Sequence, residues 1–368
     1  MKRIVHVTTV HPRDDIRIFR KECVSLAKAG YEVVQVVGDG LGSATVDGVR
    51  IVDIGERPAG RLARMRVQPA RALAAVRQLA PALVHVHDPE LLPLAAAMQR
   101  EGIPALYDAH EDVPRQILTK QWIRPWMRGT VSRSFELYEN ARVRRLAAVV
   151  AATPHIAQRF AAVARRSVVV ANYPFPEELA PPAAPQPRER AVCYVGGITR
   201  TRGAFEMVRA IAKLPGVRLL LAGRIEDAVL EAALAAEPGW AQVDHLGHVG
   251  RDEVRRVMAR ASAGLVTLLP MPSYLDALPI KMFEYMSAGL PVIASDFPLW
   301  KNIVERHGCG RCVDPTDVHA IATAIREIVD APQTVRAMGE AGRTAVQANY
   351  RWSSAEAVLL SLYGDLLG

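Results

Sequence analysis

Short apolar runs alternate with longer segments of helical periodicity along most of the chain. Arg3–Thr9 and Glu32–Gly38 are two such runs. Between them, the apolar residues of Ile16–Ala29 are spaced as on one face of a helix. Strands and helices in this order predict βαβ units around a parallel sheet. The 368 residues exceed one ordinary α/β core, which favours two such domains.

A change of composition divides this pattern into two halves. Asn172–Arg190 contains six prolines and has no apolar periodicity, which is typical of a linker. We therefore expect an N-terminal Rossmann-like domain over residues 1–172, a linker over 173–190 and a C-terminal Rossmann-like domain over 191–350. In sheets of this kind, ligands bind outside the carboxyl ends of the strands.

Composition and charge narrow the possible partners. The net charge is +8, so the surface attracts anions, but the basic residues are dispersed without an array of stacking aromatics, which argues against nucleic acid. Four cysteines in so long a chain do not form a disulfide framework, and the charged start leads directly into the first strand, so we expect no secretory leader. No uncharged apolar run reaches the roughly 18 residues of a membrane span. We expect a cytoplasmic protein, peripheral to the inner face of the plasma membrane at most.

The most informative segment is Pro270–Pro298, in which a polar loop leads into a helix expected over Pro279–Ala288. The free backbone N–H groups at the start of this helix, together with Lys281, form a site for an anion such as a phosphate. Glu284 follows three residues later and so shares a face with Lys281. A carboxylate at this point can accept hydrogen bonds from ribose hydroxyls.

Asp276 and Glu284 are separated by seven residues, and Ala288-Gly289-Leu290-Pro291-Val292-Ile293 follows them. In this arrangement the chain resembles the family 4 glycosyltransferases, which have the GT-B fold. The resemblance implies two facing Rossmann-like domains with a cleft between them and retaining sugar transfer, with Glu284 holding the ribose. It also implies that Asp276 and the backbone of Ala277 and Leu278 contact the donor sugar and phosphates. Most members have glutamate at the first acidic position, so Asp276 is a departure.

A second landmark, Tyr194–Gly203, is similar to the family's strand-loop-helix that grips the diphosphate. Gly197 stands where the family has arginine, and Arg202 stands where it has lysine. We expect Arg200 and Lys281 to supply the missing cation. With the strand ends that carry Gly223 and His248, the resemblance implies a donor site made of Gly196, Gly197, Arg200, Arg202, Gly223, His248, Ala277, Leu278, Lys281 and Glu284.

In the first half, His110 matches the strand end where the family places a histidine beside the reacting centre. The resemblance implies that His110 orients the donor sugar or stabilises charge, and is not a nucleophile. The segment Thr8–Arg17 replaces the family's Gly-rich loop, so Arg13, Asp15 and Arg17 are candidates for acceptor choice. The resemblance further implies that a terminal helix over residues 353–367 packs back on the N-terminal domain.

Other chemistry in the sequence is weaker. His85 and His87 lie two residues apart on a strand face, but no third ligand follows them, and the chain has no Asp-x-Asp, so we expect no metal. Cys309 and Cys312 form an isolated CxxC, which we expect to be inert. No cofactor is expected, because the nucleotide sugar, with UDP favoured over GDP or dTDP, is a substrate.

The segment Gln116–Arg128 mixes tryptophans, apolar residues and cations. It fits either contact with an anionic membrane or packing of the tryptophans inside the N-terminal domain.

Three functions remain open. The first is a retaining glycosyltransferase that uses a nucleotide diphosphate-sugar and a saccharide or lipid-linked acceptor in cell-surface glycan assembly. The second is a nucleotide-sugar 2-epimerase of the same fold, whose acid and base would come from Asp108, Glu111 and Asp112. The third is a non-catalytic nucleotide-sugar-binding module, suggested by Asp276 and Gly197.

Overall fold

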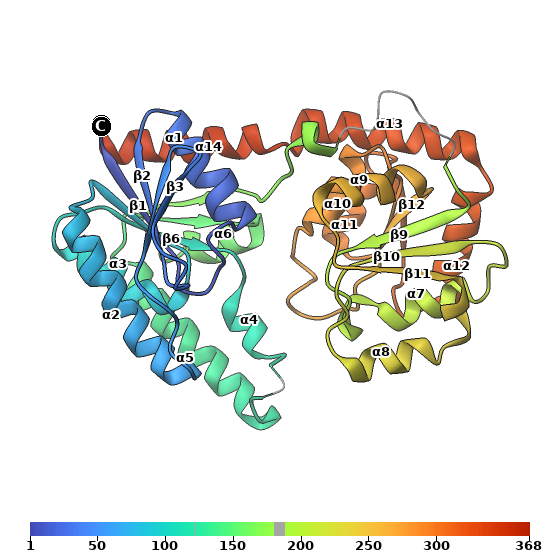
Figure 1. Cartoon of the computed structure of the whole chain (residues 1–368), viewed down its shortest axis with the longest axis horizontal. Coiled ribbons are helices and arrows are strands. Elements are labelled where there is room, and N and C mark those ends of the chain that lie inside the picture. Colours follow the sequence, from blue (N-terminus) through green and yellow to red (C-terminus); the bar gives the residue numbers. More distant parts are fainter. Residues whose placement is uncertain (121, 180–187) are drawn as a thin grey trace. The chain divides into compact units, whose positions relative to one another are not determined.

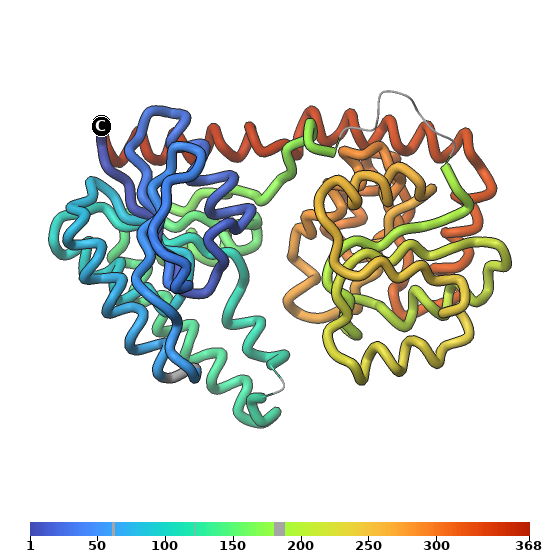
Figure 2. The backbone as a smooth tube through the Cα atoms, viewed as in Figure 1, coloured from blue at the N-terminus to red at the C-terminus, as the bar shows by residue number. Residues whose placement is uncertain are grey.

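The computed structural model describes residues 1–120, 122–179 and 188–368, with the backbone alone for residues 61 and 62. The chain divides into two compact units (Figure 1). Unit 1 comprises Met1–Asn172 together with Trp352–Gly368, and unit 2 comprises Tyr173–Arg351. The division falls where the proline-rich segment begins. Both ends of the chain lie in unit 1 (Figure 2), where the ammonium of Lys2 donates to the carbonyl of Leu367.

The described residues of unit 1 form an eight-stranded sheet of order β3-β4-β2-β1-β5-β6-β7-β8, in which only the β3–β4 pair is antiparallel. The strands are β1 Arg3–Val7, β2 Glu32–Val37, β3 Ala44–Val46, β4 Val49–Asp53, β5 Leu83–Val86, β6 Ala105–Ala109, β7 Ala148–Ala151 and β8 Ser167–Val169. The helices are η1 Ile16–Cys23, α1 Val24–Lys28, α2 Arg61–Leu79, η2 Pro89–Leu91, α3 Leu92–Arg100, α4 Val113–Ile117, α5 Pro125–Val143, α6 Pro154–Ala161 and α14 Trp352–Leu367.

The two faces of the central strands β1, β5 and β6 differ in chemistry. Alternate residues such as Val5, Val84 and Tyr107 point to one face and join an apolar core with α2 and α3. The residues between them point to the other face and include His6 and His85, which are register partners. This second face is buried and polar, and it packs against η1 and α14.

The first helix differs from the single α-helix expected over Ile16–Ala29. Its first part, η1, is π-helical, and α-helical geometry begins only at Val24. Asp15 caps its start by accepting hydrogen bonds from the backbone N–H groups of Arg17 and Ile18, both at 2.9 Å. π-Helical segments are frequent at functional sites, since they reorient side chains along a helix.

Unit 2 is a second parallel α/β layer structure. Its described residues form a six-stranded sheet of order β11-β10-β9-β12-β13-β14. The strands are β9 Ala191–Val195, β10 Arg218–Ala222, β11 Val243–Gly247, β12 Ala263–Val266, β13 Val292–Ser295 and β14 Gly310–Val313. The helices are η3 Pro176–Leu179, η4 Arg200–Arg202, α7 Ala204–Ile211, α8 Ala228–Ala235, η5 Pro238–Gln242, α9 Arg251–Arg260, α10 Ile280–Ser287, α11 Pro298–Val304, α12 Val318–Val329 and α13 Pro332–Asn349.

The ends of the segment predicted as a linker belong to the packed part of unit 2. Tyr173 lies edge-on to Phe283, and Leu179 is buried in the same core. At the other end, the guanidinium of Arg188 donates to the carbonyls of Met258, Ala261 and Gly289. Residues 180–187 of the predicted linker lie outside the described residues.

Among the described helices, none combines the length and the apolar character that crossing a membrane requires.

Replacing Trp352 by alanine should destabilise unit 1. The indole is 1% exposed, and its Nε1 donates to Ser25 Oγ at 3.0 Å, so the change leaves a large cavity and a lost hydrogen bond. We expect a loss of about 3–5 kcal/mol in the free energy of unfolding, measured by urea denaturation. Trp126→Ala is the control, because Trp126 is 74% exposed and should change stability by less than about 0.5 kcal/mol. Equal effects of the two changes would contradict the packing of α14.

Candidate functional site

In unit 2, the backbone at the carboxyl end of β9 lies against the backbone at the carboxyl end of β10, and glycines occupy the points of closest approach. The backbone N–H of Gly196 donates to the carbonyl of Ala222 at 2.8 Å. A Cβ on Gly223 would lie 1.9 Å from the Gly196 carbonyl oxygen, and both glycines have positive φ. Both positions favour glycine, so no side chain covers the backbone at this turn.

Lys281 brings a positive charge to this turn. Pro279 is the N-cap of α10, one residue outside the helix, and not its first residue as expected. The Lys281 Nζ lies 3.5 Å from the ring centroid of Tyr194, and a Cβ on Gly196 would lie 3.1 Å from it. The ammonium is buried and has no hydrogen-bond partner among the described residues. Burial and the nearby charge of Arg202 hold the pKa of Lys281 well below its usual value.

Arg202 fills the place left by Gly197. Its Nη1 donates to the Gly197 carbonyl at 3.1 Å and lies 2.9 Å from where a Cβ on Gly197 would be. The guanidinium therefore occupies the space that an arginine side chain at 197 would use. The guanidinium of Arg200 is exposed and stacks on Phe205 at 4.5 Å, so its role at the donor diphosphate stays a prediction.

Glu284 is buried on α10, where Arg251 neutralises it. The Arg251 Nη1 donates to Glu284 Oε1 at 2.7 Å, while Nη2 lies 3.5 Å from Glu178 Oε2. The carboxylate is therefore held in place before any ligand arrives.

The other predicted donor residues lie at the edge of this arrangement. Asp276 and His248 are exposed. The Ala277 carbonyl accepts a hydrogen bond from Trp300 Nε1 at 2.6 Å, and Leu278 packs against the core of unit 2. The backbone before α10 is thus fixed by the packing of unit 2.

In unit 1, His110 follows β6 and rests on a buried ion pair. Its Nε2 lies 3.0 Å from Asp108 Oδ2 and 3.2 Å from His87 Nδ1. Arg17 holds both carboxylate oxygens of Asp108, with Nε at 2.9 Å and Nη2 at 2.7 Å. Burial alone would raise the pKa of Asp108, but the charge of Arg17 and the hydrogen bonds from His110 and His87 outweigh it and hold this pKa well below its usual value.

The three predicted acceptor residues all have structural partners. Arg17 is 3% exposed and also donates to the Val170 carbonyl at 2.7 Å, so its prediction as an acceptor-side contact is wrong. Arg13 makes a bidentate pair with Asp39. Asp15 caps η1; burial opposes its ionisation, but His11 and the backbone of Ile18 lower its pKa to about 2.

His11 is a residue that sequence reasoning missed. Its ring lies 4.8 Å from that of His110, and its nitrogens lie 3.6 Å from Asp15 and from Asp88. Burial lowers the pKa of His11, but these carboxylates outweigh burial and raise it. His11 therefore adds a protonatable group beside His110.

The carboxylates that an epimerase would need are engaged elsewhere. Asp108 is locked by Arg17, Glu111 accepts from Gln116, and Asp112 caps α4 through the backbone N–H of Arg115. They do not form an acid–base pair.

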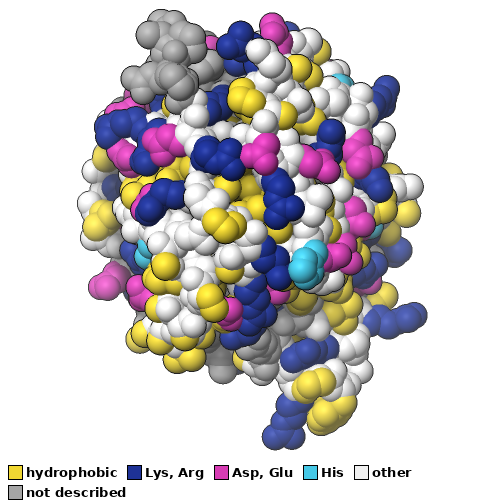
Figure 3. Space-filling model, turned by 90° about the vertical axis from the view of Figure 1, so that its right-hand side faces the viewer, with side chains coloured by type: hydrophobic (Ala, Val, Ile, Leu, Met, Phe, Trp, Pro, Cys, Tyr) yellow, Lys and Arg dark blue, Asp and Glu magenta, His cyan; other side chains and the backbone are white. Residues whose placement is uncertain are grey.

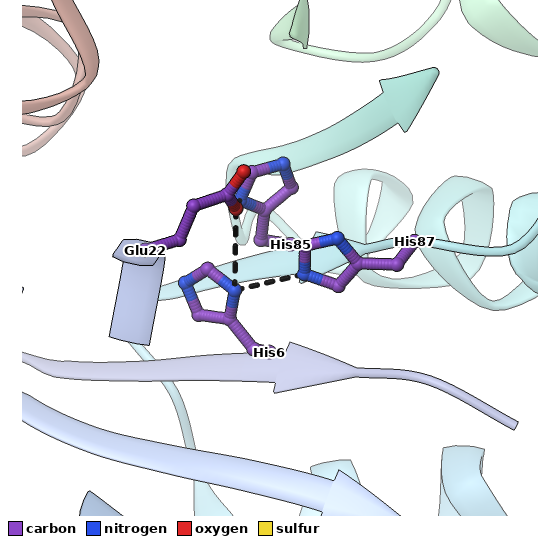
Figure 4. Close-up of side chains that lie close together, drawn as sticks. All are labelled: His6, Glu22, His85 and His87. Carbon is purple, nitrogen blue, oxygen red and sulfur yellow. Dashed lines mark hydrogen bonds and ion pairs between the residues drawn. The ribbon is translucent and has the colours of Figure 1, made fainter. Parts of the chain in front are cut away.

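His85 and His87 belong to β5 and its end, between β1 and β6. The expectation that no further ligand accompanies them is wrong, because His6 from β1 and Glu22 from η1 lie beside them (Figure 4). All four side chains are buried.

The cysteines of the CxxC are free, and the Cys309 thiol donates to the Val304 carbonyl. Burial raises the pKa of Cys309 to about 11 and that of Cys312 to about 12.

Two family models cover most of the chain. Residues 17–174 match the glycosyl transferase 4-like domain, and residues 177–345 match glycosyl transferases group 1. The chain belongs to the family 4 glycosyltransferases. The family has the GT-B fold, and the enzyme is a hexosyltransferase by class.

Curated relatives and solved structures agree with this assignment. The MMP alpha-(1->4)-mannosyltransferase of Mycolicibacterium hassiacum is 24% identical over 76% of this chain and 69% of its own. The glycogen synthase of Mycobacterium tuberculosis is 23% identical over 80% and 71%. Sucrose-phosphate synthase from Thermosynechococcus elongatus has the same fold, with a TM-score of 0.82 at 20% identity over 100% and 99% of the two chains. Anabaena HepE in complex with UDP and glucose has a TM-score of 0.76 at 14% identity over 99% and 100%.

Lys281 should destabilise the unliganded glycosyltransferase at neutral pH. Because its folded pKa lies below its unfolded pKa, the unfolded state binds a proton between the two values that the folded state does not, so stability falls as pH falls through this window. Lys281→Met should therefore raise the free energy of unfolding at pH 7 by about 1–2 kcal/mol. The gain should shrink as the pH approaches about 10.4, the unfolded value.

Thermal unfolding between pH 7 and 10 measures this difference. The control is Lys213→Met, because Lys213 is an exposed lysine of the same unit. A Lys281→Met protein that is less stable than the wild type at pH 7 would contradict the buried, unpartnered ammonium.

Proposed function

We propose that this glycosyltransferase moves a sugar, with retention, from a nucleotide diphosphate donor to a saccharide acceptor in cell-surface glycan assembly on the cytoplasmic side of the membrane. The observation that carries the donor half is the buried ammonium of Lys281, which lies beside the Gly196 turn and has no hydrogen-bond partner within the described residues. A diphosphate supplies the charge that this ammonium lacks. UDP is the favoured nucleotide, in keeping with the UDP complex of HepE.

The donor would be held by unit 2 at three points. Lys281 and Arg202 would bind the diphosphate beside the Gly196 turn. Glu284 would accept hydrogen bonds from the ribose hydroxyls, with Arg251 fixing its carboxylate. As the glycosidic bond breaks, negative charge grows on the leaving phosphate, and these fixed cations stabilise it electrostatically. The proposal needs no metal or cofactor.

His110 of unit 1 would act on the sugar. In front-face retention, the leaving phosphate takes the acceptor's proton while positive charge develops on the sugar ring. His110 would orient a hydroxyl of the donor sugar, with its ring held by Asp108. The 2-epimerase alternative is less favourable because its carboxylates are engaged. The non-catalytic alternative loses one of its two reasons, since Arg202 fills the place left by Gly197.

For the acceptor, unit 1 offers a cavity of about 470 Å³ lined by Arg57, Pro58, Gly60, Arg64, Lys120 and Trp122. Three of these side chains are cations. Arg57 is held in place by donating to the carbonyls of Gly38 and His11, each at 3.0 Å. A saccharide that carries a phosphate, as a lipid-linked acceptor does, fits this lining.

Removing the Glu284 carboxylate should abolish nucleotide recognition. We expect one of UDP, GDP, dTDP and CDP to stabilise the wild type by about 2.7 kcal/mol at a hundredfold excess over its dissociation constant. Glu284→Ala should lose most of this thermal shift, because the ribose hydroxyls lose their acceptor. The control is Glu231→Ala on the exposed side of α8, which should respond like the wild type. A folded wild type that responds to none of the four nucleotides would overturn the proposal.

We also propose that the segment 116–128 contacts an anionic membrane. Trp122 and Trp126 are 62% and 74% exposed, so the alternative in which the domain buries them does not fit. Ile117 and Ile123 pack inward, while Arg124 is exposed beside the tryptophans. Apolar rings flanked by cations suit the boundary between headgroups and acyl chains. On the face shown in Figure 3, basic and acidic side chains are interspersed.

Sedimentation with phosphatidylglycerol vesicles tests this contact. The double variant Trp126→Ala, Met127→Ala should bind at least about tenfold more weakly, since it loses most of the exposed apolar surface. Leu41→Ala is the control, because Leu41 is 73% exposed on the same unit but lies far from this segment in sequence. Equal binding by all three proteins, or binding to neutral phosphatidylcholine alone, would refute the proposal.

A further inference from the structure

The buried polar face of unit 1 contains a continuous series of hydrogen-bonding groups behind His110. His87 Nε2 lies 2.9 Å from His6 Nδ1, and His6 Nε2 lies 3.1 Å from the Tyr363 hydroxyl. The same hydroxyl lies 2.8 Å from His85 Nδ1. Apart from His110, every side chain in the series is fully or almost fully buried, and Tyr363 comes from the C-terminal helix α14.

Each of the three buried histidine rings and the Tyr363 hydroxyl carries one proton that can form a hydrogen bond. Burial lowers the pKa of His6, His85 and His87 below its usual value, so each ring is neutral and carries a single N–H. A neutral imidazole that donates from one nitrogen must accept at the other. The direction of one hydrogen bond therefore fixes the direction of all the others.

Asp108 sets that direction. Its carboxylate is ionised and can only accept, so the His87 Nδ1 at 3.2 Å must carry its proton. His87 Nε2 then accepts from His6 Nδ1–H, and His6 Nε2 accepts from the Tyr363 hydroxyl. The Tyr363 oxygen in turn accepts from His85 Nδ1–H.

The far end of the series supports the same direction. The His85 Nε2 is buried and has no hydrogen-bond partner among the described residues. When the hydrogen bonds run toward Asp108, His85 Nε2 carries a lone pair and no proton. The reverse direction would place an unsatisfied N–H at His85 Nε2. It would also place the lone pair of His87 Nδ1 against the Asp108 carboxylate. An orphaned N–H is rarer than an orphaned acceptor in folded proteins.

We infer that His85, Tyr363, His6 and His87 form a one-way hydrogen-bond chain that ends on Asp108 and holds His110 in a single tautomer. With Asp108 Oδ2 accepting from His110 Nε2–H, the His110 Nδ1 is left with a lone pair for a hydroxyl of the substrate. His87, His6 and Tyr363 are positioning residues. The inference rests on the proposed role of His110 and extends the candidate site to the C-terminal helix.

The same cluster could hold a metal ion only in another arrangement. His6, Glu22, His85 and His87 place their ligand atoms within 4.8 Å of one another (Figure 4). Two nitrogens on one tetrahedral zinc lie about 3.3–3.4 Å apart, because each bond is about 2.0–2.1 Å long. The 2.9 Å between His6 Nδ1 and His87 Nε2 is shorter and fits a hydrogen bond. Glu22 instead lies 3.2 Å from Arg17 Nε.

The first test reads the tautomers directly and needs no activity. In protein labelled with 15N-histidine, long-range 15N–1H spectra distinguish Nδ1–H from Nε2–H, and single-histidine variants assign the signals. We expect Nδ1–H at His6, His85 and His87 and Nε2–H at His110. An Nε2–H tautomer at His6 or His87, or stoichiometric zinc in the purified wild type that His6→Asn removes, would overturn the chain.

The second test is Tyr363→Phe, which removes one hydroxyl from the chain. Its matched control is Tyr107→Phe: that buried hydroxyl donates to Glu139 at 3.1 Å on the opposite face of the sheet. We expect both variants to lower the unfolding midpoint. Only Tyr363→Phe should lower kcat for donor turnover, by about tenfold, and shift its pH profile, with nucleotide diphosphate affinity unchanged within twofold.

The outcomes separate the two proposals. A Tyr363→Phe protein with the kcat and pH profile of Tyr107→Phe would show that Tyr363 only stabilises α14, and the inference would fail. A wild type that neither binds nucleotide nor turns over donor would instead refute the proposed function, while the tautomer spectra would still decide the chain.

Discussion

The buried pair of Arg17 and Asp108 is the interaction on which unit 1 depends. It joins η1 to β6, and through the Val170 carbonyl it reaches the end of β8. Two charges this deep in the protein are tolerable only because both carboxylate oxygens and most guanidinium donors are paired, and removing either partner would cost about 3–5 kcal/mol. The same pair keeps Asp108 ionised. The Arg17–Asp108 pair therefore both stabilises unit 1 and holds the carboxylate that contacts His110.

The candidate site of unit 2 depends on a different constraint, which is the close approach of the backbone at the carboxyl ends of β9 and β10. Gly196 and Gly223 bring two strand ends close together, and the ammonium of Lys281 lies beside them. This ammonium is buried without a hydrogen-bond partner in the described part of the chain, which lowers the stability of unit 2. In both units the chemistry lies at the carboxyl ends of parallel strands, as the topology of such sheets dictates.

The sequence was sufficient for the parts that depend on local pattern. The alternation of runs predicted the α/β class, and the spacing of Lys281 and Glu284 placed both on α10. It failed where partners come from distant segments. Nothing local marks Arg251 as the partner of Glu284, or joins His6 and Tyr363, which are 357 residues apart, to His87. The same holds for Arg17, whose buried partner Asp108 lies 91 residues away in the sequence. Helix α2 escaped notice because Pro69 and several arginines obscure its apolar face.

The central claim is that the bound sugar is transferred and leaves with its configuration retained. The most direct measurement is 1H and 31P NMR of a nucleotide-sugar donor incubated with the protein, without acceptor, so that slow hydrolysis reports the chemistry. We expect release of the nucleoside diphosphate and of a sugar whose first-formed anomer has the configuration of the donor. Release of the opposite anomer, or accumulation of a 2-epimer in place of the donor, would contradict it.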